Sequence, residues 1–241
     1  YNHLETRDEI NKNDPDFKWK GTSDTETILA AIDLWGFHKT CKKLLGMFAI
    51  ALWDRSDQKL YLARDRVGEK PLYYFQSNSL FSFSSEPKAF SEVNGFKKAI
   101  NLKSLSSFVK FSYVPDSCSI FESVYKVEPG SIIMLSDPTK KPSLEYFWSL
   151  ESVIIDNTFA RKAGSNKNNF KNIEDETEQI LSDVVSSQMI SDVPIGSFLS
   201  GGIDSTLITM LMQRNSSQRV KTFSIGFKES RFNEAEYALD I

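Results

Sequence analysis

The stretch GSFLSGGIDSTLITML, residues 196–211, contains the most specific local pattern in the chain. Two adjacent glycines follow a short apolar run and precede an apolar segment with helical character. Because a glycine pair is a poor former of both strands and helices, we interpret it as a turn between a strand and a helix. Backbone N–H groups in such a turn can approach an anion closely, and the helix dipole adds to the attraction. The stretch therefore predicts a phosphate-binding loop.

The residues around this loop follow the order strand, helix, strand. We expect a strand over 195–199, a helix after the glycines, and a second strand in VKTFSIGF (220–227). This order is typical of the first βαβ unit of a parallel sheet. A longer helix is expected from Ile173, with these apolar residues on one face: Ile180, Leu181, Val184, Val185 and Met189.

A polar segment separates this part of the chain from a different kind of sequence upstream. RKAGSNKNNFKN (161–172) has almost no apolar residues and is typical of a linker or disordered loop. We therefore expect one domain over 1–155, a linker over 156–172, and the beginning of a second domain over 173–241. Residues 161–172 should be the most mobile internal segment.

The first domain is predicted to be antiparallel α+β. GMFAIALWD (46–54) is a nearly continuous apolar run, as expected for a strand buried on both faces, and it forms a hairpin with KLYLARD (59–65). KPLYYFQ (70–76) and SLFSFSSE (79–86) predict a second hairpin. YKVEPGSIIMLS (125–136) predicts a strand pair around a Pro-Gly turn.

Two helices accompany these strands. SDTETILAAIDLWG (23–36) is stopped by Gly36, and NLKSLSSFVKF (101–111) is a shorter helix. Ser23 and Glu26 have the spacing of a capping box, and Asp24 suits a helix N-terminus. From spacing alone, Asp24 is interpreted as a cap.

Composition excludes several classes of function. The 241 residues are 40% hydrophobic and 25% charged, with a net charge of −3 and both signs interspersed, so no nucleic-acid or membrane surface is indicated. Cys41 and Cys118 form no metal-type spacing, and only two histidines are present. No apolar run approaches the roughly 20 residues that cross a bilayer. Without a signal peptide, a cytoplasmic location is expected. The chain begins at Tyr1, like a segment of a longer protein.

The glycine turn lacks the lysine of a Walker-type phosphate loop. Asp204 stands where a cation would be expected, and a carboxylate repels phosphates unless a divalent metal bridges them. The chemically sensible ligand is a magnesium-bound pyrophosphate. Ser200 and Ser205 would supply hydroxyl donors, and Gly201 and Gly202 backbone donors. The alternative is a tight turn in which Asp204 only caps the following helix.

SDVPIGSFLSGGIDSTLI (191–208) closely resembles the pyrophosphatase loop of the glutamine-dependent asparagine synthetases, with Thr206 where a third serine is usual. The resemblance continues in order through upstream segments that are similar to the class II glutamine amidotransferase domain of that family, and through two downstream segments. These segments are YNHLETR, SDTE, LLGMFAIALWD, LARDRVGEKPLYY, FSSEPKAF and FSYVPDSCSIFESVYKVEPG upstream, and KTFSIGF and FNEAEYA downstream. The resemblance implies stacked antiparallel sheets like those of N-terminal-nucleophile hydrolases, followed by the first βαβ of an α/β ATP-pyrophosphatase domain.

The resemblance also implies a reaction and its partners. Glutamine is hydrolysed in the first domain, and ammonia passes inside the protein to the second. There ATP, with Mg²⁺, activates aspartate as an acyl-adenylate and releases pyrophosphate, and ammonia displaces AMP to give asparagine. A homodimer is an open alternative to a single chain.

The same resemblance assigns roles to individual residues. Asp24 binds the ammonium of glutamine, an alternative to its role as a cap. Phe198 and Ile225 lie on the adenine side, with strand core as the alternative. The pyrophosphate is held by Ser200, Gly201, Gly202, Asp204 and Ser205, with Asp204 acting through magnesium.

The family's nucleophile is an N-terminal cysteine, which in this interpretation lies upstream of Tyr1. Neither Cys41 nor Cys118 is expected to replace it, so residues 1–241 alone should catalyse neither half-reaction. Arg64, Asp65 and Lys70 are interpreted as scaffold at a hairpin turn, with the Glu69 side chain reaching solvent. Two other functions stay open: a relative that amidates a different carboxylate, such as a sugar acid, and a non-catalytic relative.

Overall fold

The computed structural model describes residues 1–77, 80–155, 170–229, 231 and 233–241. The chain divides into two compact units, unit 1 (Tyr1–Ala163) and unit 2 (Gly164–Ile241). Of the linker predicted at 156–172, residues 156–169 lie outside the described residues, and 170–172 already belong to a helix. Among the helices in the described ranges, none combines the length and apolar character needed to span a membrane.

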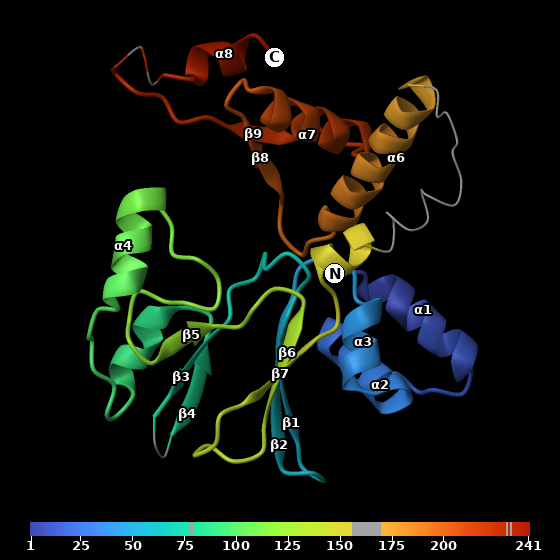
Figure 1. Cartoon of the computed structure of the whole chain (residues 1–241). Helices are drawn as coiled ribbons and strands as arrows, with labels where there is room; N and C mark the ends of the chain where they lie inside the picture. Colours follow the sequence, from blue (N-terminus) through green and yellow to red (C-terminus); the bar gives the residue numbers. More distant parts are fainter. Residues whose placement is uncertain (78–79, 156–169, 230, 232) are drawn as a thin grey trace. The chain divides into compact units, whose positions relative to one another are not determined.

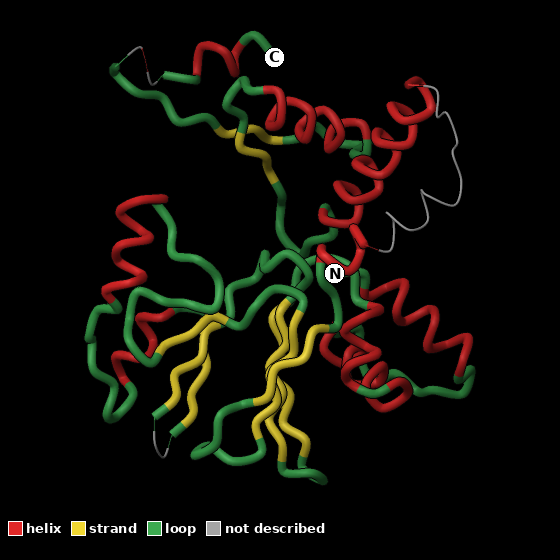
Figure 2. The backbone as a smooth tube through the Cα atoms, viewed as in Figure 1, coloured by secondary structure: helices red, strands yellow, loops and turns green. Residues whose placement is uncertain are grey.

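Unit 1 contains two antiparallel sheets (Figures 1 and 2). The four-stranded sheet has the order β1-β2-β6-β7, formed by β1 (Ala49–Asp54), β2 (Lys59–Arg64), β6 (Ser131–Leu135) and β7 (Ser143–Tyr146). The three-stranded sheet has the order β4-β3-β5, formed by β4 (Phe81–Ser84), β3 (Tyr73–Gln76) and β5 (Val124–Lys126). Both predicted hairpins, β1–β2 and β3–β4, are confirmed.

Alternation along β2 places apolar side chains on both faces of the four-stranded sheet. Leu62 packs with Leu72, Val127 and Ile133, in a cluster that also takes up side chains from β3 and β4 and so lies between the two sheets. Ala63 instead packs in a cluster with Cys41 and other side chains on the helical side. Among the described residues of this unit, the helices with stated bounds are α1 (His3–Asn13), α2 (Asp24–Trp35), α3 (Phe37–Lys43), the 3₁₀ helix η1 (Pro87–Glu92) and α4 (Leu102–Phe111), and residues 150–155 are also helical. The antiparallel α+β prediction is confirmed.

Two strand predictions in unit 1 are wrong, the first in which strands pair and the second in how far a strand is buried. The segment 125–136 was predicted as one strand pair, but β5 joins the three-stranded sheet and β6 joins the four-stranded sheet. The run 46–54 was predicted to be buried on both faces, but β1 is an edge strand, and its Trp53 side chain is 51% exposed. An edge strand has a hydrogen-bonded neighbour on one side only, so an apolar sequence does not by itself bury the side chains of the strand.

Unit 2 contains the predicted strand-helix-strand order. Strands β8 (Gly196–Phe198) and β9 (Lys221–Phe223) pair in parallel, with α7 (Ile203–Arg214) between them in sequence. The long helix α6 (Phe170–Gln188) begins three residues before the predicted Ile173. It packs on α7 through Val185, whereas Ile180 and Val184 of its predicted apolar face are exposed. A short helix, α8 (Ala235–Leu239), follows near the end of the chain.

Candidate functional site

Asp24 is the first residue of α2, in unit 1. The N-cap is Ser23, whose Oγ accepts a hydrogen bond from Thr25 N at 3.2 Å, and Asp24 Oδ1 accepts from the same N–H at 2.8 Å. The Glu26 carboxylate accepts from Lys20 N and Gly21 N rather than from Ser23, so the predicted capping box is not formed. These bonds, that from Lys20 first, hold the pKa of Glu26 below its usual value. Ser23 and Asp24 thus share the Thr25 N–H at the start of the helix, and the Asp24 carboxylate has further lone pairs that can accept from another partner.

A pocket of about 640 Å³ opens beside Asp24, entirely within unit 1. Its wall is formed by the first turns of α2, by the start of β1, and by the segment that contains Lys70 and Pro71. Ile28, Ile50 and Leu52 make much of the lining apolar, while Asp24 and Lys70 contribute opposite charges. A pocket with apolar walls and a few charged groups suits a small polar ligand with charges of both signs.

Tyr1 fixes the backbone next to this carboxylate. Its hydroxyl donates to the Asp24 carbonyl oxygen at 2.8 Å, and its ring packs against the core cluster around Phe48. Burial, together with the nearby Asp24 charge, raises the pKa of Tyr1, so the hydroxyl keeps its proton and remains a donor. Twenty-three positions separate the two residues, and no local sequence signal predicts their contact.

Neither cysteine has the surroundings of a nucleophile. Cys41 is fully buried in α3, and burial raises the pKa of its thiol to about 12. Cys118 is exposed, and it is not among the residues that line the pocket. Because the thiolate is the reactive form, Cys41 stays protonated and inert near neutral pH.

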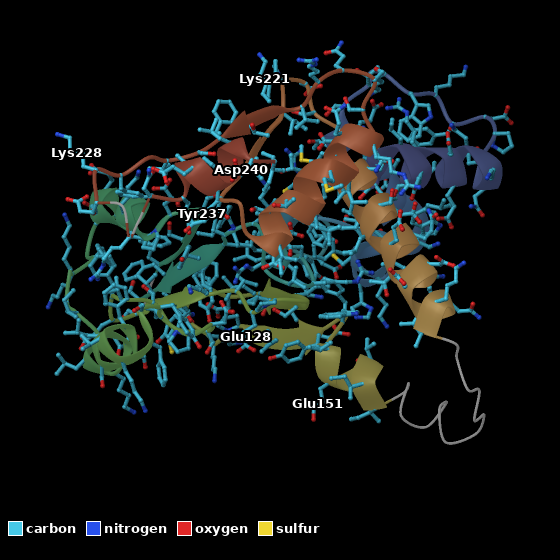
Figure 3. All side chains as sticks on the ribbon, turned by 90° about the horizontal axis from the view of Figure 1, so that it is seen from above. Glu128, Glu151, Lys221, Lys228, Tyr237 and Asp240 are labelled. Atoms are coloured by element: carbon cyan, nitrogen blue, oxygen red, sulfur yellow. The ribbon has the colours of Figure 1, made fainter. Side chains whose placement is uncertain are left out.

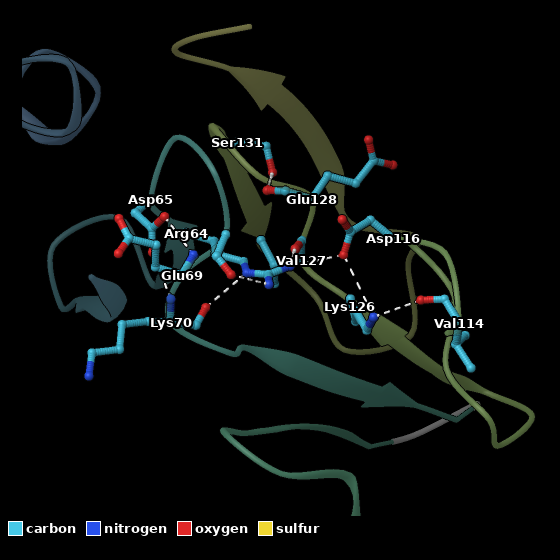
Figure 4. A network of polar contacts seen from close by, with 11 residues as sticks. Arg64, Asp65, Glu69, Lys70, Val114, Asp116, Lys126, Val127, Glu128 and Ser131 are labelled. Carbon is cyan, nitrogen blue, oxygen red and sulfur yellow. Dashed lines mark hydrogen bonds and ion pairs between the residues drawn. The ribbon is translucent and has the colours of Figure 1, made fainter. Parts of the chain in front are cut away.

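Arg64 and Asp65 form a buried network that connects the two sheets of unit 1 (Figure 4). The Arg64 guanidinium donates to the carbonyl oxygens of Gly68, Lys70 and Val127, and contacts Asp116 at 3.3 Å. The Asp65 carboxylate accepts three backbone N–H groups, from Phe48, Glu69 and Lys70.

Arg64 and Asp65 have the structural role that was predicted for them. Their place in the fold was predicted incorrectly. The segment 65–72 is not a hairpin turn, since β2 and β3 lie in different sheets and the segment crosses between them. The Glu69 side chain is exposed, as predicted. Lys70 belongs to this crossing through its backbone, while its side chain is directed away from the network and lines the pocket.

Replacing Arg64 with methionine should lower the free energy of unfolding of unit 1 by about 3 kcal/mol, because three carbonyl oxygens lose their donor in a buried site. All four tryptophans lie in unit 1, so urea unfolding followed by tryptophan fluorescence reports on it. Arg55→Met, at an exposed position in the β1–β2 turn, is the control and should change stability little. Equal effects of the two substitutions would contradict a structural role for Arg64.

The predicted glycine loop, in unit 2, joins β8 to α7 and is closed by its own serines. Ser200 Oγ and Ser205 Oγ lie 2.9 Å apart, and Ser205 Oγ also accepts from Ser200 N at 3.3 Å. Ser205 Oγ donates to the Gly202 carbonyl oxygen at 3.2 Å, and Gly202 N donates to Ser200 Oγ at 3.4 Å. Several of these distances are at the long end for hydrogen bonds, so an anion could replace them at low cost. The structure therefore brings both predicted serines and both glycines together.

Gly201 lies directly against α8. Figure 3 labels Tyr237, the residue of this helix that Gly201 approaches. The φ of Gly201 is +80°, and a Cβ built there would lie 2.5 Å from Tyr237 Cβ and 2.8 Å from the Tyr237 carbonyl carbon. Both the backbone conformation and the close approach require glycine.

Gly201→Ala should displace α8 and strain the loop, with a cost of about 2–4 kcal/mol from the left-handed conformation and the overlap together. The expected result is faster hydrogen exchange at the amides of α7 and α8. Gly202→Ala is the matched control, because Gly202 has φ −74° and its nearest contact to an added Cβ is 3.4 Å. Unchanged exchange in Gly201→Ala would contradict the close packing.

The remaining predicted site residues of unit 2 are exposed. Asp204 lies in the first turn of α7, but Gly202 is the N-cap residue, so the alternative in which Asp204 caps the helix is wrong. Phe198 is 77% exposed and Ile225 is 66% exposed, and their adenine-side and strand-core roles both stay predictions.

The loop residues fit a magnesium ion held together with a phosphate ligand. Within the described residues, no group of three or more His, Cys, Asp or Glu side chains gathers as a metal cage. Mg²⁺ usually takes only one or two carboxylates and completes its coordination with water and substrate phosphates. One exposed carboxylate, that of Asp204, precedes Ser205 in sequence, and the Ser205 hydroxyl lies 2.9 Å from that of Ser200; carboxylate and hydroxyl oxygens are appropriate donors for that mode of binding.

Comparison with protein families divides the chain in a similar way. Residues 1–148 match the family described as glutamine amidotransferase domain, and residues 176–241 match the family described as asparagine synthase.

Individual relatives match nearly the whole chain. Asparagine synthetase (glutamine-hydrolyzing) 1 of Bacillus subtilis is 33% identical over 245 residues, covering 99% of this chain and 35% of the relative. The putative asparagine synthetase (glutamine-hydrolyzing) 2 of Methanocaldococcus jannaschii is 31% identical over 243 residues, covering 98% and 43%. Amidase chry2 of Gibberella zeae is 32% identical over 206 residues, covering 86% and 29%. The chain thus spans less than half the length of each of these relatives.

Proposed function

The chain belongs to the family of proteins that carry a glutamine amidotransferase domain, and from this premise we propose that it is part of an enzyme that makes asparagine from aspartate, with glutamine as nitrogen donor and ATP as energy source. The observation that carries the proposal is the hydroxyl- and glycine-lined loop that joins α7 to β8, a strand paired in parallel with β9, in the same chain as the pocket at Asp24. We assign residues 1–155 to glutamine hydrolysis and 173–241 to the beginning of the synthetase domain.

In the glutamine half, Asp24 is the partner of the substrate's α-ammonium group. A fixed carboxylate at the mouth of the pocket forms a charge-assisted hydrogen bond with an ammonium, which is stronger than a neutral one. Tyr1 holds the backbone of Asp24, and the apolar wall around Ile28 accommodates the methylene groups of glutamine. The attacking thiolate would come from a cysteine outside residues 1–241, since the surroundings of Cys41 keep its thiol protonated.

In the ATP half, the loop holds the pyrophosphate end of the nucleotide. The N–H groups of Gly201 and Gly202 and the N-terminal end of α7 provide positive potential, and the hydroxyls of Ser200 and Ser205 turn from one another to the phosphate oxygens. When bound, Mg²⁺ supplies the charge that makes the Asp204 carboxylate compatible with the phosphates. Phe198 and Ile225 face the adenine. A loop that stabilises departing pyrophosphate suits cleavage between the α and β phosphates, with aspartyl-AMP as the acylating species and AMP as the second product.

The test uses the full-length protein with glutamine, aspartate and ATP. Asparagine, glutamate, AMP and pyrophosphate should form in equal amounts. Formation of ADP and phosphate would overturn the proposal, because that outcome requires attack at the γ-phosphate.

A second candidate is the amidation of a different carboxylate by the same two half-reactions. One relative that is 32% identical to this chain is named as an amidase and not as an asparagine synthetase, so similarity to this chain is not confined to proteins of the latter name. This candidate would be favoured if aspartate does not trigger release of pyrophosphate and another carboxylic acid does. Absence of both glutamine hydrolysis and pyrophosphate release in the folded full-length protein would indicate a non-catalytic relative.

A further inference from the structure

Beneath the glycine loop, hydroxyl side chains connect β8 to α7 in unit 2. Ser197 of β8 is buried, and its Oγ lies 2.9 Å from Thr209 Oγ1 on α7. Thr209 Oγ1 in turn donates to the Ser205 carbonyl oxygen at 2.8 Å. Neither Ser197 nor Thr209 is among the residues predicted for the loop site from sequence.

The direction of these hydrogen bonds follows from the number of protons. A threonine hydroxyl carries one proton, and that of Thr209 is used on the Ser205 carbonyl oxygen. Ser197 must therefore donate to Thr209 Oγ1, which is a shorter contact than its alternative, the Phe198 carbonyl oxygen at 3.4 Å. The two hydrogen bonds therefore point the same way: Ser197 donates to Thr209, and Thr209 donates to the Ser205 carbonyl oxygen.

Ser205 is also the residue that closes the loop, through its contacts with Ser200 and Gly202. The other end of the loop is fixed separately, because Ser224 Oγ donates to the Leu199 carbonyl oxygen at 2.6 Å. Both ends of the loop are thus tied to the two-stranded sheet. A shift of α7 relative to β8 would change where the Ser205 hydroxyl points.

We propose that Ser197 and Thr209 are positioning residues that hold Ser205 in the orientation required to bind a pyrophosphate. The inference rests on the proposed function of the loop. Neither side chain contacts the ligand; both act through the Ser205 backbone. Because the two belong to one chain of hydrogen bonds, removing either should have the same consequence as removing both.

The experiment measures the dissociation constant of magnesium pyrophosphate by calorimetry, and ATP–pyrophosphate exchange, in the full-length protein. Thr209→Val and Ser197→Ala should each weaken pyrophosphate binding about fivefold, as expected for loss of one hydrogen bond. The double variant should bind no more weakly than the weaker single variant. Thr209→Ser, which keeps the hydroxyl, should bind like the wild type. Glutamine hydrolysis should be unchanged in every variant.

The matched control is Thr177→Val on α6. Thr177 Oγ1 makes the same kind of bond, to the carbonyl oxygen of Ile173 at 2.6 Å, but far from the loop in sequence and on another helix. This variant should lose a similar amount of thermal stability and keep wild-type affinity for pyrophosphate. A purely structural role of Thr209 would make its variant behave in the same way as the control.

Each outcome decides between the inference and its premise. Wild-type affinity in folded Thr209→Val and Ser197→Ala, or additive losses in the double variant, would overturn the inference while leaving the loop's function intact. If Thr209→Val does not fold, the pyrophosphate affinities of Ser197→Ala and Thr209→Ser test the inference instead. A wild-type protein that neither binds pyrophosphate nor exchanges it overturns the proposed function, and the inference falls with it.

Discussion

Asp204→Ala in the full-length enzyme should abolish aspartate-dependent ATP–pyrophosphate exchange and leave glutamine hydrolysis at the wild-type rate. Asp204 is an acidic residue in the first turn of α7, and among the described residues no side chain makes a cap hydrogen bond at the N-cap of this helix, Gly202. Removal of the Asp204 carboxylate should therefore cost the helix less than about 1 kcal/mol. The loss for metal-bound pyrophosphate is much larger, because an alanine offers magnesium no oxygen.

The measurement compares the two half-reactions in one preparation, with thermal unfolding as a check on the fold. Asp175→Ala, which removes an exposed aspartate from α6 in the same unit, is the control and should retain both activities. Loss of both half-reactions in folded Asp204→Ala would argue against separate sites. Retained exchange would remove Asp204 from the site altogether.

Asp24→Asn should reduce kcat/KM for glutamine about tenfold to a hundredfold. The substitution keeps an Oδ1 that can accept from Thr25 N, and Ser23 still caps the helix, so the local structure should be preserved. What disappears is the negative charge. A charge-assisted hydrogen bond to an ammonium is worth on the order of 1.5–3 kcal/mol, which corresponds to the expected fall in kcat/KM.

The second nitrogen source separates binding from synthesis in this variant. Ammonia supplied directly should drive synthesis at the normal rate in Asp24→Asn, because it bypasses the glutamine pocket. Asp33→Asn removes an exposed charge from the other end of α2 and should change neither reaction. If Asp24→Asn has wild-type kinetics with glutamine, Asp24 contributes only to the start of the helix.

Some of the site could be predicted from sequence because its signals are local. Adjacent glycines between a strand and a helix define the loop, and the structure brings Ser200, Gly201, Gly202 and Ser205 together as expected. Asp24 could be placed at the start of α2 from the Ser23 pattern and the stop at Gly36. Its contact with Tyr1 and its place in one pocket with Lys70 could not, since these residues are 23 and 46 positions away in sequence.

Local sequence signals were enough to predict α2, α4, α6, α7, the two hairpins and the parallel order of β8 and β9, because turn residues, caps and side-chain periodicity act over a few neighbouring positions. They did not predict α1 or α3, and they did not predict which sheet each strand joins. β2 and β3 separate into two sheets across 65–72, β5 and β6 separate across their Pro-Gly turn, and β1 is left at an edge. Alternating apolar residues specify a buried face but not the partner that covers it. That choice was made by long-range packing, and by the buried Arg64 and Asp65 side chains that satisfy the backbone where the chain crosses from one sheet to the other.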